Sequence, residues 1–229
     1  MGGGANIIDF SLKLENVRFA YPNKFGELGF ELIVENFSPG LCTAVLGENG
    51  SGKTTLGKLI VGILRPDSGR VLYNGEDIAN WRLGKIGKRA GYLFQEPSRQ
   101  IFAPRPIEEI AFPLELRGVS KMEAEKKARD LLIEFGLENI ADSTTFTLSR
   151  GEKQRLAIAA VMACEPKFFV LDEPTTGLDK LQRGVLSELL KKLISRNIGV
   201  LIISHDRVFV EELGADIRFM KGGRFVDGE

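Results

Sequence analysis

The alternation of apolar and polar residues along the first third of the chain predicts β-strands. "SLKLENVRF" and "FELIVENF" alternate with a period of two, whereas "LCTAVLG" is a continuous apolar run of the kind buried on both faces of a sheet. "RVLYNGEDI" contains Asn74-Gly75, a two-residue hairpin signal. The opening of the chain is therefore expected to be rich in β-structure around one central strand.

Helical spacing begins at Ser120. In "SKMEAEKKARDLLIEFG", Ser120 and Glu123 form a capping-box pair, and Gly136 provides a stop. The apolar residues of this segment fall at positions 124, 128, 131, 132 and 135, which share one helix face. Upstream, Pro97, Pro104, Pro106 and Pro113 predict a passage of loops and short helices. These segments together predict a helical insertion at about 96–155.

The last third alternates between strands and helices. "KFFVLDE" and "IGVLIISH" are predicted as parallel core strands, separated by the helix "KLQRGVLSELLKKLISRN", whose apolar positions 181, 185, 186, 189, 190 and 193 make one stripe. "IRFMKGGRFV" is predicted as a short hairpin around Gly222-Gly223. The fold class is therefore α/β: a parallel central sheet, an N-terminal antiparallel β subdomain and an inserted α-helical subdomain. We expect one domain over 1–229, with about 5–95 and 156–229 forming the core and β subdomain.

Composition narrows the classes of function. A chain of 229 residues with 43% apolar content can bury a full core, and its 31 basic and 31 acidic residues cancel, so no nucleic-acid partner is expected. Cys42 and Cys164 lie in apolar surroundings, which is typical of reduced core thiols in a cytoplasmic compartment. No run approaches the roughly 18 apolar residues that a membrane span requires.

"GENGSGKT", from Gly47 to Thr54, matches the phosphate-binding loop pattern between a buried strand and a helical pattern. Its backbone N–H groups would bind phosphate oxygens, Lys53 would reach the β- and γ-phosphates, and Thr54 would ligate magnesium. The fold is accordingly predicted as a P-loop nucleotide-hydrolase core. The candidate nucleotide-binding residues of this stretch are Gly47, Asn49, Gly50, Ser51, Gly52, Lys53, Thr54 and Thr55.

Two adjacent carboxylates follow the strand "KFFVLDE". Asp172 would hold magnesium as a second anchor beside Thr54, and Glu173 would orient or deprotonate the attacking water. The alternative is a pair of acids that cap a helix after Pro174. His205, the single histidine, follows another strand at the sheet edge where ligands bind in parallel sheets, although a lone histidine is more often structural.

With these pieces in order, the chain resembles the nucleotide-binding domain of ATP-binding-cassette (ABC) proteins from about Leu12 to Gly228. Tyr21 in "FAYPN" is similar to the aromatic that stacks on adenine, Gln95 in "YLFQEP" to the glutamine loop, and "LSRGE" to the signature. Asp179 in "TTGLD" is similar to the D-loop aspartate and His205 to the switch histidine. Tyr21 could instead be an ordinary strand-end aromatic, Gln95 a solvated loop residue, and Asp179 a helix cap.

The resemblance implies that two such domains enclose two ATP molecules with Mg²⁺. Ser149 and Gly151 would contact the γ-phosphate on the partner, and Asp179 would couple the two sites. The implied catalytic residues are Glu173, His205, Lys53 and Gln95, and the implied metal site is Thr54, Gln95 and Asp172. The implied partners are a second ABC ATPase subunit, the same chain or a paralogue, and an integral membrane transporter subunit, which would place the chain at the cytoplasmic face of the membrane.

"QEPSRQIF" is similar to the glutamine-loop region of energy-coupling-factor and cobalt-type importer ATPases, which implies import of a vitamin or a transition-metal ion. Ser98 and Arg99 depart from the acidic residues common there, and the sequence ends with "FVDGE", where members of that group often carry a C-terminal extension. Ile101 and Phe102 would line a groove for the membrane partner or belong to the insertion's own core. Another ABC importer, a non-transport cassette ATPase, and a P-loop kinase or GTPase are the alternatives.

The signature-like stretch "LSRGE" departs from the family pattern at Arg150 and Glu152. Ser149 and Glu152 form S-x-x-E, which predicts a capping box at the start of a helix. Glu152 brings a negative charge toward an anion, and our hypothesis is that Arg150 offsets it as a compensated pair.

Overall fold

The computed structural model describes residues 10–21 and 30–228, which form two sheets flanked by helices. The first sheet is antiparallel and has the order β2-β1-β4-β5: Phe30–Phe37, Leu12–Phe19, Ser68–Tyr73 and Glu76–Asp77. The second has the order β10-β9-β3-β8-β7-β6: Arg224–Val226, Asp216–Lys221, Cys42–Leu46, Gly199–Ile203, Phe168–Asp172 and Ala90–Leu93. The pairs from β9 to β6 are parallel, and β10 is antiparallel to β9, so the predicted α/β class is confirmed.

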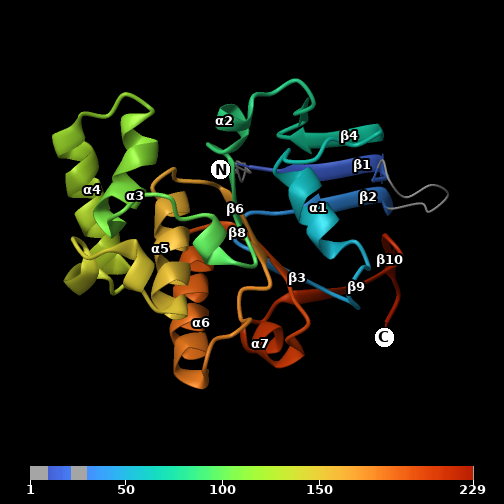
Figure 1. The fold of residues 1–229 in the computed structure, drawn as a ribbon. Helices are drawn as coiled ribbons and strands as arrows, with labels where there is room; N and C mark the ends of the chain where they lie inside the picture. Colours follow the sequence, from blue (N-terminus) through green and yellow to red (C-terminus); the bar gives the residue numbers. More distant parts are fainter. Residues whose placement is uncertain (1–9, 22–29, 229) are drawn as a thin grey trace, which may run out of the picture.

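Seven α-helices are assigned in the described residues: α1 (Lys53–Ile60), α2 (Leu83–Ile86), α3 (Pro106–Glu115), α4 (Lys121–Glu134), α5 (Arg150–Met162), α6 (Lys180–Ser195) and α7 (Arg207–Glu212). Three short 3₁₀ turns, η1 to η3, lie at Pro97–Arg99, Glu138–Ile140 and Thr145–Thr147. Figure 1 shows α3 and α4 at one end of the molecule and the antiparallel sheet at the other. Among residues 10–21 and 30–228, no helix is both long and apolar enough to cross a bilayer.

Side chains along the central strands point alternately to the two faces of the sheet, and this divides the core into two layers. On β7, Phe169 and Leu171 pack with the helices α3 to α6, whereas Phe168 and Val170 pack with α1 and the antiparallel sheet. Asp172 continues the second set by the period of two that governs strands. The last residue of β7 is thereby directed toward α1, the helix that follows the phosphate-binding loop.

Most of the predicted elements are confirmed. Asn74 and Gly75 form the β4–β5 turn with φ of 51° and 80°, as a type I′ hairpin requires. The Gly222-Gly223 hairpin joins β9 to β10. Ser120 caps α4 by accepting a hydrogen bond from the Glu123 N–H. Cys42 is a free, buried cysteine, and burial raises the pKa of its thiol to about 12, which keeps the thiol protonated.

One detail differs from expectation. The predicted stripe on α6 is apolar throughout, yet Leu181 and Val185 are exposed and only its later members are buried, because the first turns of α6 extend beyond the sheet. The proline-rich passage contains loops and short helices as predicted, including the ten-residue helix α3 with Pro113 inside it. The predicted insertion boundary at 155 falls within α5, which contacts both α3 and β6, and the division there stays a prediction.

Candidate nucleotide-binding site

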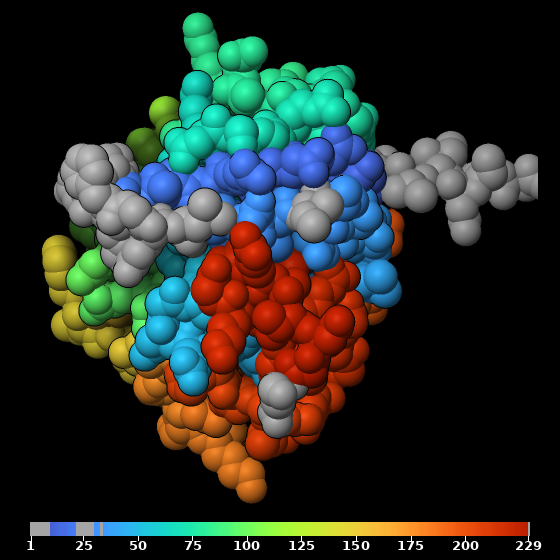
Figure 2. Space-filling view, turned by 90° about the vertical axis from the view of Figure 1, so that its right-hand side faces the viewer, coloured from blue at the N-terminus to red at the C-terminus, as the bar shows by residue number. Residues whose placement is uncertain are grey.

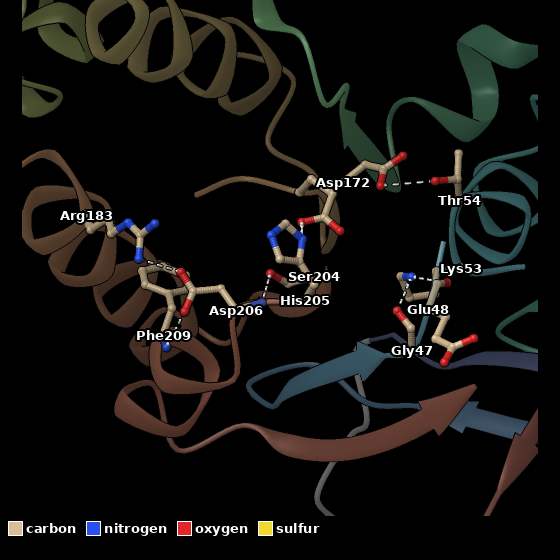
Figure 3. Close-up of polar contacts among 11 residues, drawn as sticks. Gly47, Glu48, Lys53, Thr54, Asp172, Arg183, Ser204, His205, Asp206 and Phe209 are labelled. Carbon is tan, nitrogen blue, oxygen red and sulfur yellow. Dashed lines mark hydrogen bonds and ion pairs between the residues drawn. The ribbon is translucent and has the colours of Figure 1, made fainter. Parts of the chain in front are cut away.

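The phosphate-binding loop occupies the turn between β3 and α1. At Gly47, φ is 154° and an added Cβ would lie 2.2 Å from the Met220 carbonyl oxygen, so only glycine fits. Lys53 Nζ donates to the carbonyl oxygens of Gly47 at 2.6 Å and Glu48 at 2.9 Å, as Figure 3 shows. Burial lowers the pKa of Lys53, and the nearby Glu173 and Asp172 carboxylates oppose that shift. The ammonium is thus fixed over a loop shaped for an anion.

Asp172 joins three elements at the end of β7. Thr54 Oγ1, on α1, donates to Asp172 Oδ1 at 3.2 Å, and the Tyr92 hydroxyl, on β6, donates to Oδ2 at 2.8 Å. Burial and the Asp172 charge raise the Tyr92 pKa, so the phenol stays a donor. Both carboxylate oxygens are therefore oriented before any ligand binds.

Glu173 and His205 come from neighbouring parallel strands. The Glu173 N–H donates to the Ile203 carbonyl oxygen at 2.7 Å, and its φ of 49° is unusual for a residue other than glycine. This conformation turns the carboxylate toward His205, whose Nδ1 lies 2.8 Å from Glu173 Oε2. The Glu173 side chain is 10% exposed and that of His205 is 70% exposed. A strained backbone at such a residue, costing on the order of 1–3 kcal/mol, is typical of functional sites.

A cavity of about 900 Å³ gathers most of the predicted site residues. Its walls include, from the predicted set, Tyr21, Gly47, Asn49, Gly50, Ser51, Gly52, Lys53, Thr54, Thr55, Gln95, Glu173 and His205. Asp172 lies beside it and lines an adjoining cavity of about 430 Å³ with Thr54, Gln95 and Arg150. Residues from both ends of the sequence thus meet at the carboxyl edge of the parallel sheet, where ligands bind in such folds.

Tyr21 stands at the edge of the large cavity. Its hydroxyl lies 3.3 Å from Thr55 Oγ1, and its ring packs edge-to-face on Phe19 with centroids 4.9 Å apart. The ring is exposed, as a stacking platform must be. The rest of the predicted aromatic loop, from Pro22, lies outside the described residues.

Ser149, Gly151 and Asp179 lie elsewhere, at the starts of α5 and α6, and do not line the large cavity. The predicted capping box is confirmed: the Glu152 N–H donates to Ser149 Oγ at 3.3 Å and Glu152 Oε2 accepts from the Ser149 N–H at 2.8 Å. Glu152 Oε2 also accepts from the Ser149 hydroxyl at 2.6 Å. These hydrogen bonds lower the Glu152 pKa, with a contribution from the charge of Arg155. Asp179 caps α6 in the same manner.

Sequence reasoning missed several residues of the site. The cavity also includes Glu48, Thr176, Ile203 and Gly222. The Tyr92 hydroxyl donates a hydrogen bond to Asp172, beside the cavity. The signal for Tyr92 was available, because a buried tyrosine at a strand end requires a partner for its hydroxyl. Gly222 carries no such signal: its place depends on the hairpin turn packing on the phosphate-binding loop, where the Gly223 N–H donates to the Ser51 carbonyl oxygen at 2.8 Å.

The oxygen donors beside the cavity fit Mg²⁺. A hydroxyl and a carboxylate, from Thr54 and Asp172, are hard ligands of the type that Mg²⁺ accepts, and the ion usually completes its shell with water and phosphate oxygens. In the described part of the chain, no group of three or more His, Cys, Asp or Glu side chains is arranged to hold a metal.

Comparisons with known proteins agree with this geometry. The family model described as "ABC transporter" matches residues 32–176. An ABC transporter ATP-binding protein of Pyrococcus horikoshii is 35% identical over 93% of this chain and 80% of its own length. A relative from Caldanaerobacter subterraneus is 36% identical over 94% of this chain, which spans only 38% of that protein's length.

Two solved structures share the fold. The structure of cbiO1 from Clostridium perfringens, described as part of the ABC transporter complex cbiONQ, has a TM-score of 0.84 and 34% identity, covering 94% of this chain and 86% of its own. A dimeric ATP-binding cassette bound to ADP and Pi in a post-hydrolysis state has a TM-score of 0.83 and 26% identity. The match covers 95% of this chain and 97% of that chain. This chain belongs to the ABC transporter family and has the fold of the nucleotide-binding domain of an ABC-type ATPase.

Proposed function

We propose that the chain binds ATP with Mg²⁺, hydrolyses it in a dimer, and powers a membrane transporter of the energy-coupling-factor or cobalt type. The observation that carries the proposal is the cavity of about 900 Å³ that the phosphate-binding loop, Glu173 and His205 line together. The dimeric relative bound to ADP and Pi supports nucleotide binding between two subunits. The similarity to cbiO1 supports the subgroup.

The residues of the site have distinct tasks. The loop N–H groups and Lys53 bind the phosphates. Thr54, and Asp172 beside the cavity, would hold Mg²⁺, which would supply positive charge to neutralise the phosphates. Glu173 accepts a proton from the attacking water, a role typically worth about 100- to 10,000-fold in rate. His205 holds the Glu173 carboxylate through Nδ1.

Ser149, Gly151 and Asp179 would act on ATP held by the partner subunit. Their position at the N-terminal ends of α5 and α6 supports this, because a helix N-terminus favours an anion. In the same proposal Tyr21 stacks on adenine and Gln95, exposed between the two cavities, joins the metal site to the segment 96–155 that receives the membrane partner.

The glutamine-loop region supports the energy-coupling-factor subgroup. Gln100 bridges the end of β6: its Nε2 donates to the Tyr92 carbonyl oxygen at 3.0 Å, and its Oε1 accepts from the Phe94 N–H at 3.2 Å. Ile101 packs on the core, whereas Phe102 is 63% exposed and stacks edge-to-face on Phe112. Phe102 and Phe112 together offer an apolar surface to a helix of an integral membrane subunit at the cytoplasmic face.

Two measurements test the proposal. ATP hydrolysis by the purified chain should fall at least about 100-fold in Glu173→Gln, which removes the base but keeps the shape, and should be unaffected in the surface variant Glu188→Gln. Capture of the tagged chain from detergent-solubilised source membranes should recover an integral membrane protein with a small substrate-binding partner. Full activity of Glu173→Gln would reject the catalytic assignment, and recovery of soluble partners alone would reject the transporter in favour of a non-transport cassette ATPase.

A further inference from the structure

The first turn of α6 contacts two parts of the site that lie far apart in the sequence. Arg183 Nη1 forms an ion pair with Asp206 Oδ2 at 2.7 Å, and Arg183 Nε donates to the Leu178 carbonyl oxygen at 3.3 Å. Figure 3 shows the guanidinium directed at Asp206, with His205 next along the chain. A single planar side chain therefore joins the loop before α6 to the segment that follows β8.

Asp206 is held by hydrogen bonds to residues on both sides of it, so a displacement of Asp206 would also move His205, the residue before it. Its side chain is 12% exposed, and its Oδ1 caps α7 by accepting from the Phe209 N–H at 3.2 Å. The Asp206 N–H donates to Oγ of the fully buried Ser204 at 3.0 Å. His205 lies between these two anchored residues, and its Nδ1 contacts Glu173. The position of the imidazole thus depends on where Asp206 is held.

The other end of the Arg183 contact leads to residues proposed to face the partner subunit. Leu178 precedes Asp179, whose Oδ1 accepts from the Gln182 N–H at 2.8 Å. The Gln182 side chain packs on Gly151, where an added Cβ would lie 2.9 Å from its amide carbon. Gln182 and Arg183, adjacent in the chain, therefore contact the signature and D-loop on one side and the His205 segment on the other.

We propose that Arg183 is a positioning residue for His205, which makes the placement of the imidazole over Glu173 depend on the loop that ends at Leu178. The inference rests on the proposed ATPase function and adds to it a named connection within one subunit. An Arg–carboxylate ion pair with one partner largely buried, reinforced by a bond to a backbone carbonyl, is geometrically more restrictive than an exposed pair. Displacing the loop would carry the guanidinium, Asp206 and the histidine together.

The chain's single histidine allows a direct test, because imidazole NMR signals report His205 alone. Arg183→Ala is expected to shift these signals and to lower kcat by about 10- to 100-fold, the scale of a misplaced catalytic group, with the ATP concentration at half-maximal rate unchanged. Asp206→Asn retains the α7 cap, since asparagine caps as well as aspartate, and should act like Arg183→Ala. Arg183→Lys should recover part of kcat by restoring the charge.

Two controls separate positioning from loss of stability. Lys191→Ala removes an exposed ion pair with Glu188 on the same helix and should change neither kcat nor the NMR signals. The double variant Arg183→Ala with His205→Ala should be no slower than His205→Ala alone, since both act through one group. Unchanged histidine signals in a folded Arg183→Ala protein, or additive losses in the double variant, would overturn the inference. A wild-type chain without ATPase activity would instead reject the proposed function itself.

Discussion

The guanidinium of Arg150 lies against Gly177, in the loop between β7 and α6. A Cβ on Gly177 would lie 2.8–3.0 Å from Nε, Cζ and Cδ of Arg150. Arg150, one of the two residues that depart from the family signature, therefore packs on the loop leading to Asp179 within the same subunit. Arg150 also lines the cavity that includes Thr54 and Asp172.

Gly177→Ala should destabilise the protein for two separable reasons. The φ of 72° costs a non-glycine residue roughly 1–2 kcal/mol, and the new methyl group would displace the exposed Arg150 side chain, which costs less because that side chain is flexible. Denaturant unfolding of Gly177→Ala, Arg150→Gly and the double variant measures both terms. We expect Arg150→Gly to recover only part of the loss; complete recovery would mean that the backbone at residue 177 is unstrained, and no recovery would mean that the collision is absent.

Glu152→Gln should raise ATPase activity by about fivefold. The Ser149 hydroxyl donates to the Glu152 carboxylate, and a charged acceptor holds a donor more tightly than a neutral amide by roughly 1 kcal/mol, which the γ-phosphate of the partner's ATP must overcome. Steady-state hydrolysis at saturating ATP is the measurement. Equal or lower activity of Glu152→Gln would show that this hydrogen bond does not compete with phosphate.

The compensated-pair hypothesis for Arg150 and Glu152 can be decided by a double-mutant cycle. In the structure Arg150 packs on Gly177, whereas Glu152 binds Ser149 and its pKa responds to the charge of Arg155. We therefore expect the effects of Arg150→Gly and Glu152→Gln on ATPase activity to add within about 0.5 kcal/mol. A larger coupling free energy between the two substitutions would support the compensated-pair hypothesis, with the two residues interacting in the assembled dimer.

Tyr92→Phe should weaken magnesium binding rather than ATP binding. The lost hydroxyl fixes Asp172 Oδ2, and removal of a group that orients a metal ligand typically costs about 10- to 100-fold in metal affinity. The Mg²⁺ concentration for half-maximal hydrolysis should rise accordingly, while binding of ATP in the presence of EDTA stays unchanged. Tyr73→Phe offers a control at a tyrosine that bonds only the Ile60 carbonyl oxygen. An unaltered Mg²⁺ requirement would contradict the assignment of Asp172 to the metal site.

Glu109→Gln should stabilise the protein at neutral pH. Burial raises the pKa of Glu109, although N–H donors of Ala103 and Phe102 oppose the shift. A carboxyl with a raised folded-state pKa binds protons more tightly when folded, so stability falls as pH rises from the unfolded pKa through the folded one. Gln keeps an acceptor oxygen for both N–H groups but never ionises. Its advantage in melting temperature at pH 7 should shrink toward pH 4.5; an advantage independent of pH would refute the linkage.

The elements and the site residues differ in how well the sequence predicted them. Strands and helices whose apolar residues repeat with a clear period were predicted correctly. The signal for such an element, the apolar run of β7 or the cap and stripe of α4, lies within one short segment of the sequence. The exposure of Leu181 and Val185 was not predictable, since it depends on how far α6 extends past the sheet.

Contiguous motifs such as Gly47–Thr54 were recognisable because their chemistry depends on spacing in one segment. The contacts of Arg150 with Gly177 and of Arg183 with Asp206 were not, because each joins segments whose separation in space is fixed only by the packing of α5 and α6. The roles of Ser149, Gly151 and Asp179 toward the partner's nucleotide stay predictions.

The turn between β9 and β10 has a thermodynamic consequence. Gly223 donates to Ser51 in the phosphate-binding loop and accepts from the Glu31 N–H of β2, and Figure 2 shows the hairpin packed beside the antiparallel sheet. Three distant segments thereby share one set of backbone bonds. A phosphate that tightens the loop should therefore also slow the opening of the hairpin, and nucleotide binding should increase the hydrogen-exchange protection of amides in β9 and β10 as well as in the loop.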